Sequence, residues 1–522
     1  MIGIVIPFAQ WKDIYEPIYG SLADQSLYDA HRTLDGDGNP DRYLQLIPAA
    51  ARKALGEFYT PEWLAEQVLD RAGYKGEPLL DPSCGAGAFL AKVGKQATGW
   101  EINPLAARIA RARCPLASIE VQDAFTAVAA QPFPFVVGNP PWVNWRNLGT
   151  EYRSRIDPLW REYGLFDQRG LKARLGGAMD DLSSLMTYVC ADRHLALDGR
   201  LAFLLPMAHF RSAGGGSAFR RFVLPGGLYL RVVRIEEVTG TRAFEGAMTR
   251  AVIAVFEKSR TPTVYPVPYM RESVEHDAAP VSKDPAAPWS VMPKGAAASE
   301  IAGKSAYVAR VGAHSGGAAG VYWVDVLEEC GPLVLIRNRA DTGRNTYAEV
   351  TAEVERELVY PLVRGRDLRE RCATASAHII LPHRPSDGKP IEVDQMQRDY
   401  PRAYAYFEQF REPMLTRPHY LRHFEKLRKP YWSLYNVGPY TFARHRVAWR
   451  EQSTSFQCAI LKEGDIADAK LVTIALDSAE EAAYVADFLN REDVRTFIDS
   501  YVLRTQISTH VMKYVHIPPF RG

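Results

Sequence analysis

Cysteine is scarce in this sequence and is never paired along the chain. The 522 residues include only six cysteines, and no two of them form a Cys-x-x-Cys pair. They are Cys84, Cys114, Cys190, Cys330, Cys372 and Cys458. Such spacing disfavours a zinc site and a disulfide framework, and it suits a reducing cytoplasm. We therefore expect a cytoplasmic protein without a metal site.

Long apolar runs, internal repeats and an excess of either charge are also missing. The apolar stretch from Met1 to Trp11 is too short to cross a bilayer, and no basic segment precedes it, so we expect no membrane span. The net charge is only +2, so any strongly basic surface must be local. Hydrophobic residues make up 47% of the chain, and its length suits two or three globular domains.

The run from Val136 to Trp142 is the most informative stretch. The apolar segment Phe133–Val137 predicts a buried strand, and Asn-Pro-Pro-Trp (139–142) follows at its carboxyl end, where open α/β sheets bind ligands. Two consecutive prolines fix the backbone, so the Asn139 amide oxygen and the Pro140 carbonyl can converge on one amino group. An aromatic ring two residues further on can stack on a flat base.

A small-residue loop precedes this strand in the sequence. Residues 78–90 (PLLDPSCGAGAFL) predict a strand, a turn through Gly85 and Gly87, and the start of a helix. The loop lacks the Gly-Lys-Ser/Thr of a phosphate loop and the third glycine of a dinucleotide fingerprint, so a nucleoside without a pyrophosphate fits better. Upstream, Thr60 is a candidate N-cap and Pro61 a candidate first residue of a helix.

Two acidic residues follow the next predicted strands. Glu101 ends a second strand, where its carboxylate can accept hydrogen bonds from ribose hydroxyls. Asp123 follows a third strand (118–121), where its carboxylate can accept a hydrogen bond from an adenine amino group. Further on, we predict a helix at 181–197 and strands at 199–206, 231–236 and 250–256. Before the last of these, Phe244 lies in a Gly-bearing loop that we expect beside the binding edge.

These motifs, in this order, resemble the gamma class of DNA adenine-N6 methyltransferases. The resemblance rests on Phe58-Tyr-Thr-Pro61, Asp81-Pro-Ser-Cys-Gly-Ala-Gly-Ala-Phe89, Glu101, Asp123 and Asn139-Pro-Pro-Trp142. It implies an α/β, Rossmann-like domain with a seven-stranded, mostly parallel sheet, followed by an α+β target-recognition domain. The commonest fourth residue of the catalytic motif in this class is Tyr, and here it is Trp142, which preserves stacking but not a hydroxyl.

The resemblance also implies a cofactor, S-adenosyl-L-methionine, and a target, an adenine flipped out of duplex DNA. The expected catalytic residues are Asn139, Pro140, Trp142 and Phe244. The expected cofactor-binding residues are Tyr59, Thr60, Asp81, Ser83, Gly85, Gly87, Glu101, Ile102, Asp123, Ala124 and Asn139.

The expected domain order is a helical extension (1–50), a methyltransferase domain (51–258), a Pro/Ala/Ser-rich connection (259–299) and a DNA target-recognition domain (300–522). Within the last domain, basic residues alternate with aromatic ones, which favours contacts with phosphates over a merely solvated helix face. The expected DNA-binding residues are Arg411, Arg417, Arg422, Lys426, Arg428, Lys429, Arg444 and Arg446.

Two other classes stay open at this level. Asn-Pro-Pro-aromatic also occurs in methyltransferases that act on RNA or protein glutamine, and the chain could be a DNA-recognition subunit without turnover. We find no Asp…Glu-x-Lys nuclease set, and residues 1–50 leave too little room for a nuclease domain. A cleaving partner or another defence-system subunit is therefore expected to be a separate chain. The recognition sequence cannot be read from these residues.

Overall fold

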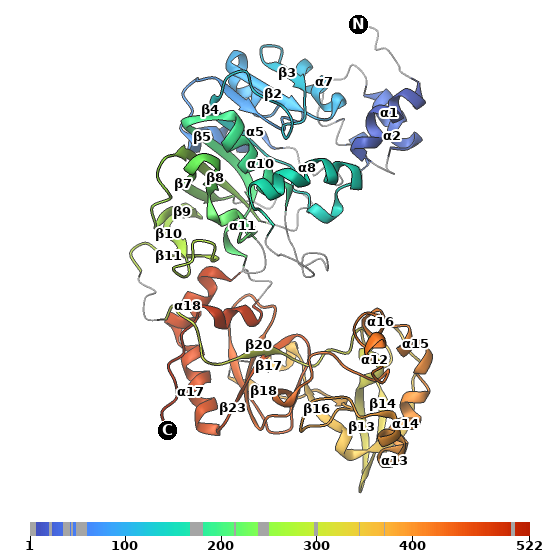
Figure 1. Cartoon of the computed structure of the whole chain (residues 1–522). Coiled ribbons are helices and arrows are strands. Elements are labelled where there is room, and N and C mark those ends of the chain that lie inside the picture. Colours follow the sequence, from blue (N-terminus) through green and yellow to red (C-terminus); the bar gives the residue numbers. More distant parts are fainter. Residues whose placement is uncertain are drawn as a thin grey trace. The chain divides into compact units, whose positions relative to one another are not determined.

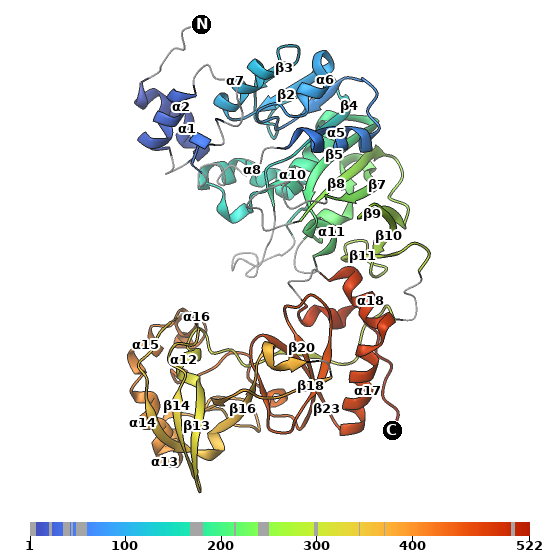
Figure 2. The same ribbon diagram turned by 180° about the vertical axis from the view of Figure 1, so that it is seen from behind.

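The computed structural model describes most of the chain, and its contacts divide it into two compact units. Described are residues 7–19, 23–34, 42, 45–48, 60–166, 181–212, 216–238, 250–296, 301–343, 345–369, 371–502 and 507–522. The N-terminal unit comprises Met1–Ala297, and the C-terminal unit comprises Ala298–Gly522 (Figures 1 and 2). Among the described helices, none is long and apolar enough to cross a membrane.

The N-terminal unit is built on one eleven-stranded sheet in the order β11-β10-β9-β7-β8-β5-β4-β1-β2-β3, with β6 paired to β7. Its strands are β1 (Leu79–Asp81), β2 (Ala97–Glu101), β3 (Ser118–Val121), β4 (Phe133–Gly138), β5 (Leu195–Pro206), β6 (Val223–Leu224), β7 (Leu228–Glu237), β8 (Ala251–Ser259), β9 (Val267–Arg271), β10 (Val274–Pro280) and β11 (Trp289–Pro293). From β3 to β5 all neighbours are parallel, and β8 is antiparallel to both β5 and β7. The sheet is mostly parallel from β3 to β5, as expected, but it has eleven strands where seven are expected, because β6 and β9 to β11 extend it beyond β7 and β8.

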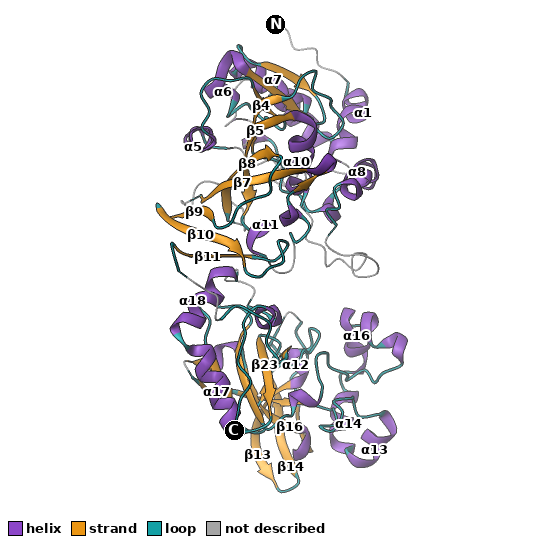
Figure 3. Ribbon diagram, turned by 60° about the vertical axis from the view of Figure 1, so that its left-hand side comes forward, coloured by secondary structure: helices purple, strands orange, loops and turns teal. Residues whose placement is uncertain are grey.

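Helices cover both faces of this sheet (Figure 3). The main ones are α5 (Glu62–Ala72), α6 (Leu90–Val93), α7 (Pro104–Arg113), α8 (Thr150–Glu162), α10 (Leu182–Val189) and α11 (Ala208–Arg211). Successive residues of β5, from Leu201 to Leu205, are all fully buried. A strand whose side chains alternate between two faces is buried throughout only when both faces are covered, which is why this strand has a continuous apolar sequence.

The first two helices pack on the same unit. They are α1 (Phe8–Tyr19) and α2 (Gln25–Thr33), where the sequence suggests one helical stretch at 14–30. Trp11, Tyr15 and Leu27 form a core cluster with Leu105 and Ile109 of α7. The helical N-terminal segment therefore covers the helix that follows Glu101.

Three further expectations about the N-terminal unit are wrong. The helix expected at 181–197 ends at Val189, a π-helical turn (Cys190–His194) follows, and Leu195 already pairs with Phe133 in the sheet. The segment expected as a connection (259–299) supplies β9, β10 and β11, because its Pro- and Ala-rich composition hides an alternation that buries Val267 and Tyr269. Helix α5 begins one residue late, with Pro61 instead of Thr60 in the cap position and no side-chain cap.

The C-terminal unit contains a four-stranded sheet (β12-β23-β20-β21), a six-stranded sheet (β15-β14-β13-β19-β16-β22) and a hairpin (β17-β18). Its strands are β12 (Ala309–Val311), β13 (Trp323–Cys330), β14 (Leu333–Asn338), β15 (Thr351–Glu355), β16 (Val359–Val363), β17 (Leu368–Arg369), β18 (Cys372–Ala373), β19 (Ala377–Ile380), β20 (His445–Arg450), β21 (Cys458–Leu461), β22 (Ile466–Ala467) and β23 (Leu471–Leu476). Its helices are α12 (Ala319–Tyr322), α13 (Val393–Asp399), α14 (Pro401–Glu408), α15 (Arg411–Leu415), α16 (Pro418–His423), α17 (Ala479–Asn490) and α18 (Glu492–Tyr501).

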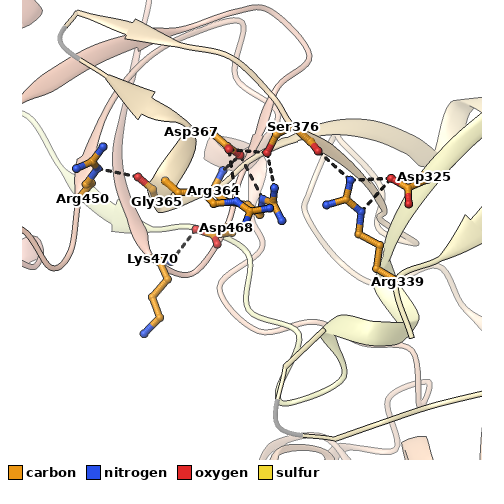
Figure 4. A network of polar contacts seen from close by, with 10 residues as sticks. Asp325, Arg339, Arg364, Gly365, Asp367, Ser376, Arg450, Asp468 and Lys470 are labelled. Carbon is orange, nitrogen blue, oxygen red and sulfur yellow. Dashed lines mark hydrogen bonds and ion pairs between the residues drawn. The ribbon is translucent and has the colours of Figure 1, made fainter. Parts of the chain in front are cut away.

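A polar network joins the parts of this unit (Figure 4). The Asp367 carboxylate accepts hydrogen bonds from the backbone N–H of Arg364 at 2.9 Å and from the Ser376 hydroxyl. Arg450 donates to the Gly365 carbonyl at 2.7 Å, and Arg339 donates to the Ser376 carbonyl at 2.9 Å. These hydrogen bonds, some partly buried and some exposed, connect the turn at 364–368 to both sheets.

Candidate active site

The residues expected to bind a ligand meet at the carboxyl edge of the parallel strands. Asp81 ends β1, Glu101 ends β2 and Asn139 follows β4, and these strands are neighbours. The Ser83 hydroxyl donates to the Asn139 carbonyl at 3.5 Å. A Cβ atom on Gly138 would lie 2.9 Å from Asp81 Oδ1, so β1 and β4 approach each other closely at this edge.

The two glycines of the small-residue loop have different roles. Both have positive φ, +52° at Gly85 and +81° at Gly87, where other residues are strained. A Cβ on Gly87 would lie 2.8 Å from Cys114 Sγ, so Gly87 lets the loop pack on the end of α7. A Cβ on Gly85 would meet no heavy atom of the described residues within 4 Å. The space beside Gly85 is therefore open to a ligand.

Glu101 holds this loop and the start of α7 together. Its two carboxylate oxygens accept the backbone N–H groups of Gly85 and Asn103, each at 2.8 Å. Burial raises its pKa above the usual value, against the effect of these hydrogen bonds. Ile102, the next residue, is half-buried.

Asp81 is the more strongly perturbed carboxylate. It is 1% exposed, and burial with the nearby Glu101 charge raises its pKa to about 8. Within the described residues, no Lys or Arg contributes to the pKa of either carboxylate. Two buried acids without a cation are costly for the fold, and a cationic ligand with N–H and O–H donors would relieve that cost.

Asp123 lies two residues beyond β3 and has two partners that the sequence did not indicate. Its Oδ1 accepts the Phe125 N–H at 3.0 Å, and its Oδ2 accepts Arg155 of α8 at 2.9 Å. Arg155 lies 4.7 Å from the ring centroid of Tyr152, whose hydroxyl also bonds Asp123. No pattern in the polar stretch after Trp142 pointed to these residues, because α8 brings them to Asp123 only through tertiary packing.

Next to Asp123, the Ala124 carbonyl accepts a hydrogen bond from His194 Nε2 at 3.1 Å. His194 is fully buried in the π-helical turn, and its ring meets that of Trp100 edge-on at 4.8 Å. The turn that cuts α10 short thus supports the Asp123–Ala124 segment.

The Asn139–Trp142 turn is fixed on both sides. Pro140 is buried, and the Trp142 indole N–H donates to the Leu204 carbonyl of β5 at 3.2 Å, which leaves the ring partly exposed. Directly after it, the Val143 carbonyl accepts the Leu182 N–H at 2.8 Å.

Beside this turn lies a polar cluster that the sequence analysis missed. The Asp181 carboxylate accepts both the N–H and the hydroxyl of Ser183, and that hydroxyl lies 2.8 Å from His209 Nε2. Burial raises the pKa of Asp181 to about 7 and lowers that of His209 to about 3, so the imidazole is neutral. The only sequence feature that points to this cluster is Asp181, an acidic residue at the start of a predicted helix.

Three residues expected in the site remain: Tyr59, Thr60 and Phe244. Tyr59 and Phe244 lie outside the described residues. Thr60 is described and half-buried just before α5, and no side-chain cap bond marks it.

The expected DNA-binding residues divide into three groups. Arg417 and Arg446 are only 3% and 1% exposed, and they donate hydrogen bonds to backbone carbonyls inside the unit. The expectation that they bind DNA is therefore wrong, and they stabilise the fold instead. Arg411, Lys429 and Arg444 form ion pairs with Glu408, Glu392 and Glu463. Arg422, Lys426 and Arg428 are exposed, with no ion pair to another described residue.

Comparison with known proteins agrees with this arrangement. The fold resembles that of the Type IIL restriction-modification enzyme MmeI, solved in complex with DNA, at a TM-score of 0.55 and 14% identity. The alignment covers 91% of this chain and 69% of that one. This likeness shows a shared α/β fold.

The sequence comparisons are more specific. Residues 41–265 match the family described as N-6 DNA Methylase. The Type II methyltransferase M.CvrRI of Paramecium bursaria Chlorella virus XZ-6E is 29% identical over 163 residues, 30% of this chain. The Type II methyltransferase M.HincII of Haemophilus influenzae is 21% identical over 220 residues, 40% of this chain. The chain covers 38% of the length of each of these relatives.

Proposed function

We propose that the protein is a site-specific DNA methyltransferase that transfers a methyl group from S-adenosyl-L-methionine to the N6 amino group of adenine. One observation carries the proposal. The Asn-Pro-Pro-Trp turn stands at the same sheet edge as the open glycine loop and the buried carboxylates, in a stretch that matches the N-6 DNA methylase family.

The residues at this edge fit the cofactor. Gly85 leaves space for it, and the Glu101 and Asp123 carboxylates supply acceptors for ribose hydroxyls and an adenine amino group. Burial raises the pKa of Asp81 to about 8, and a cationic cofactor beside it would favour the ionised carboxylate. Ser83, Ile102 and Ala124 lie beside these groups, and Tyr59, Thr60, Gly87 and Asn139 complete the proposed set. When bound, the cofactor supplies a methyl group activated by its sulfonium.

The catalytic turn acts on the target amino nitrogen. Its lone pair is delocalised into the base, so it is a weak nucleophile. If Asn139 Oδ1 and the Pro140 carbonyl accept its two N–H groups, the nitrogen becomes pyramidal with its lone pair aimed at the methyl group. Trp142 and Phe244 would stack on the flipped base, which offsets part of the extrusion cost at about 1–3 kcal/mol per base.

The protein would serve as the modification component of a restriction–modification or related phage-defence system. Two of the relatives that it matches are named Type II methyltransferases, which supports this assignment. Its partner would be duplex DNA, with a separate nuclease or other defence subunit where one exists. Residues 300–522 would select the sequence and bind phosphates.

The test uses the purified full chain. Calorimetry measures S-adenosylmethionine binding, and mass spectrometry of methylated duplex measures N6-methyladenine. We expect both binding and N6-methyladenine on duplex DNA, with sequencing of methylated DNA revealing the site. Methyl transfer to RNA or to protein glutamine instead would overturn the substrate, and cofactor binding without turnover on any DNA would indicate a recognition subunit.

A further inference from the structure

Three histidines and a tyrosine of the C-terminal unit form a continuous row of rings, called here the histidine ladder: His314, His419, His423 and Tyr435. Successive ring centroids lie 4.8, 5.5 and 5.1 Å apart. His419 and His423 lie one turn apart on α16, which places them on the same face of that helix. His314 and Tyr435 are joined through their backbones, by hydrogen bonds of 2.9 and 3.1 Å.

The ladder is held in place from inside the unit. Arg417 donates to the carbonyls of Ser315, Tyr431 and Met414 at 2.8, 2.6 and 3.1 Å, which ties together the segments that carry the rings. A Cβ on Gly316 would lie 2.8 Å from His419 Cβ, so the backbone beside His314 packs directly on α16. The Gly316 N–H donates to His314 Nδ1 at 2.9 Å, which leaves Nε2 as the protonated nitrogen of the neutral ring.

The surroundings of the ladder are positively charged. Lys470 and Glu451 act on His314, and Arg417, Arg422 and the other two imidazoles act on His419. Burial is the main cause that lowers the pKa of both rings. Lys470 lowers the pKa of His314 further and Glu451 opposes it, whereas Arg417 and Arg422 both lower the pKa of His419. His419 Nδ1 is buried and has no hydrogen-bond partner within the described part of the chain.

The outer end of the ladder is open to solvent. Tyr435 is 41% exposed, His423 is partly exposed, and Arg422 and Lys426 next to it are exposed. Within the described residues, no group of three or more His, Cys, Asp or Glu side chains is arranged to hold a metal ion. A polyanion is the partner that suits a row of mutually tilted imidazoles flanked by exposed cations that form no ion pair with another described residue.

We propose that the histidine ladder, with Arg422 and Lys426, is a phosphate-binding surface for duplex DNA, and that DNA binding there is coupled to proton uptake by the ladder. The inference rests on the proposed function for its choice of DNA over other polyanions. It goes beyond that function because it assigns a pH dependence to the DNA-binding step.

The direction of the effect follows from the charges. A phosphate beside an imidazole favours the imidazolium form, so the pKa of the ladder is higher in the complex than in the free protein. Because the pKa of such an imidazole is higher in the complex, its protonation increases the affinity for DNA at low pH. This increase is lost as the pH rises through the pKa of the complex. Because each protonated ring disfavours protonation of the next, we expect about one proton per complex and thus at most a tenfold loss of affinity per pH unit.

The experiment measures duplex affinity of the full chain by fluorescence anisotropy at fixed ionic strength, from about pH 5.5 to 8. His423→Gln should flatten the pH dependence, because it removes the imidazole at the solvent-exposed end of the ladder. Lys426→Ala should weaken binding by a similar factor at every pH and leave the pH dependence intact. His276→Gln is the matched control, since His276 lies on β10 of the N-terminal unit, and it should change neither property.

A second measurement needs no variant. Calorimetric titration of the wild type in two buffers of different ionisation enthalpy gives the number of protons bound with the DNA. Net uptake near pH 7 supports the inference. No uptake, or an unchanged pH dependence in folded His423→Gln, overturns it. A methylation assay on the same preparations separates the two proposals, because the proposed function survives if methylation proceeds without proton uptake, and fails if uptake occurs without methylation.

Discussion

The edge of the sheet in the N-terminal unit and the basic segment of the C-terminal unit use charged side chains in opposite ways. At the edge, Asp81 and Glu101 are buried, and backbone N–H groups hold them. In the basic segment, Arg422 and Lys426 are exposed and bind nothing described in their own chain. A buried acid is committed to one geometry and one ligand, whereas an exposed cation can bind any phosphate that comes within reach.

The basic segment also contains its own contrast. Arg417 and Arg422 are five residues apart, yet one bonds four backbone carbonyls inside the unit and the other faces solvent. Charge counted along the sequence is therefore a poor guide to surface charge. The predictions below test which charged or polar group acts on a ligand and which acts on the fold.

The largest effect is expected from Asn139→Ala. This change removes an acceptor that orients the target amino group, so methylation should fall by about a hundredfold or more, the usual size for one such catalytic group. Cofactor affinity should fall far less than methylation, because Asn139 is one of many residues proposed for the cofactor, whereas its amide oxygen is one of only two acceptors proposed for the target amino group. Radiolabelled methyl transfer and calorimetry measure the two effects. Asn147→Ala, at an exposed position in the same stretch, is the control. Activity within tenfold of wild type would contradict the assigned role.

The second prediction concerns the cofactor carboxylates. Glu101→Gln and Asp123→Asn should each weaken S-adenosylmethionine binding about tenfold to a hundredfold, since a hydrogen bond to a charged group contributes about 1.5–3 kcal/mol. Glu120→Gln, on exposed β3 surface, should leave the affinity unchanged. Because Glu101 also holds the glycine loop, melting temperatures should accompany the calorimetry. Unchanged affinity in both variants would refute the cofactor assignment.

Arg417→Met sharpens the comparison within the basic segment. Removing the guanidinium takes a donor from the Tyr431 and Met414 carbonyls, and each buried group left unsatisfied costs about 1–3 kcal/mol. The Ser315 carbonyl keeps the Ala318 N–H at 3.3 Å. We expect a clear drop in melting temperature, at about 2–4 °C per kcal/mol for a unit of this size. Arg422→Met is the matched control and should melt like the wild type. Equal melting of both variants would mean that Arg417 does not support the fold.

Much of the N-terminal site could be predicted because its signals are local. Asp81, Glu101 and Asn139 each lie at or next to the end of an apolar strand, and parallel neighbours bring such ends together. Tyr152 and Arg155 could not be found in this way, since only the packing of α8 brings them to Asp123.

Elsewhere the sequence was a weaker guide for a related reason. The strands β9 to β11 were hidden by a composition typical of linkers, although their alternation was present. The burial of Arg417 and Arg446 depends on backbone carbonyls, which no side-chain pattern reveals. The roles of Tyr59 and Phe244 remain predictions, since both residues lie outside the described ranges.

The smallest effect, and the most specific one, is expected at the exposed cations. If Arg422 and Lys426 bind phosphates, the double change to Ala should weaken binding to cognate and scrambled duplexes by a similar factor. It should also flatten the dependence of log affinity on log salt by about one unit per lost contact, because fewer counterions are released. Loss of a residue that contacts a base would instead reduce the discrimination at one base pair by about 1–3 kcal/mol, and it would leave the salt dependence of the affinity unchanged. Arg411→Ala is the control, since Glu408 already pairs with it. If the double variant keeps both affinity and salt dependence, the DNA surface lies elsewhere in the C-terminal unit.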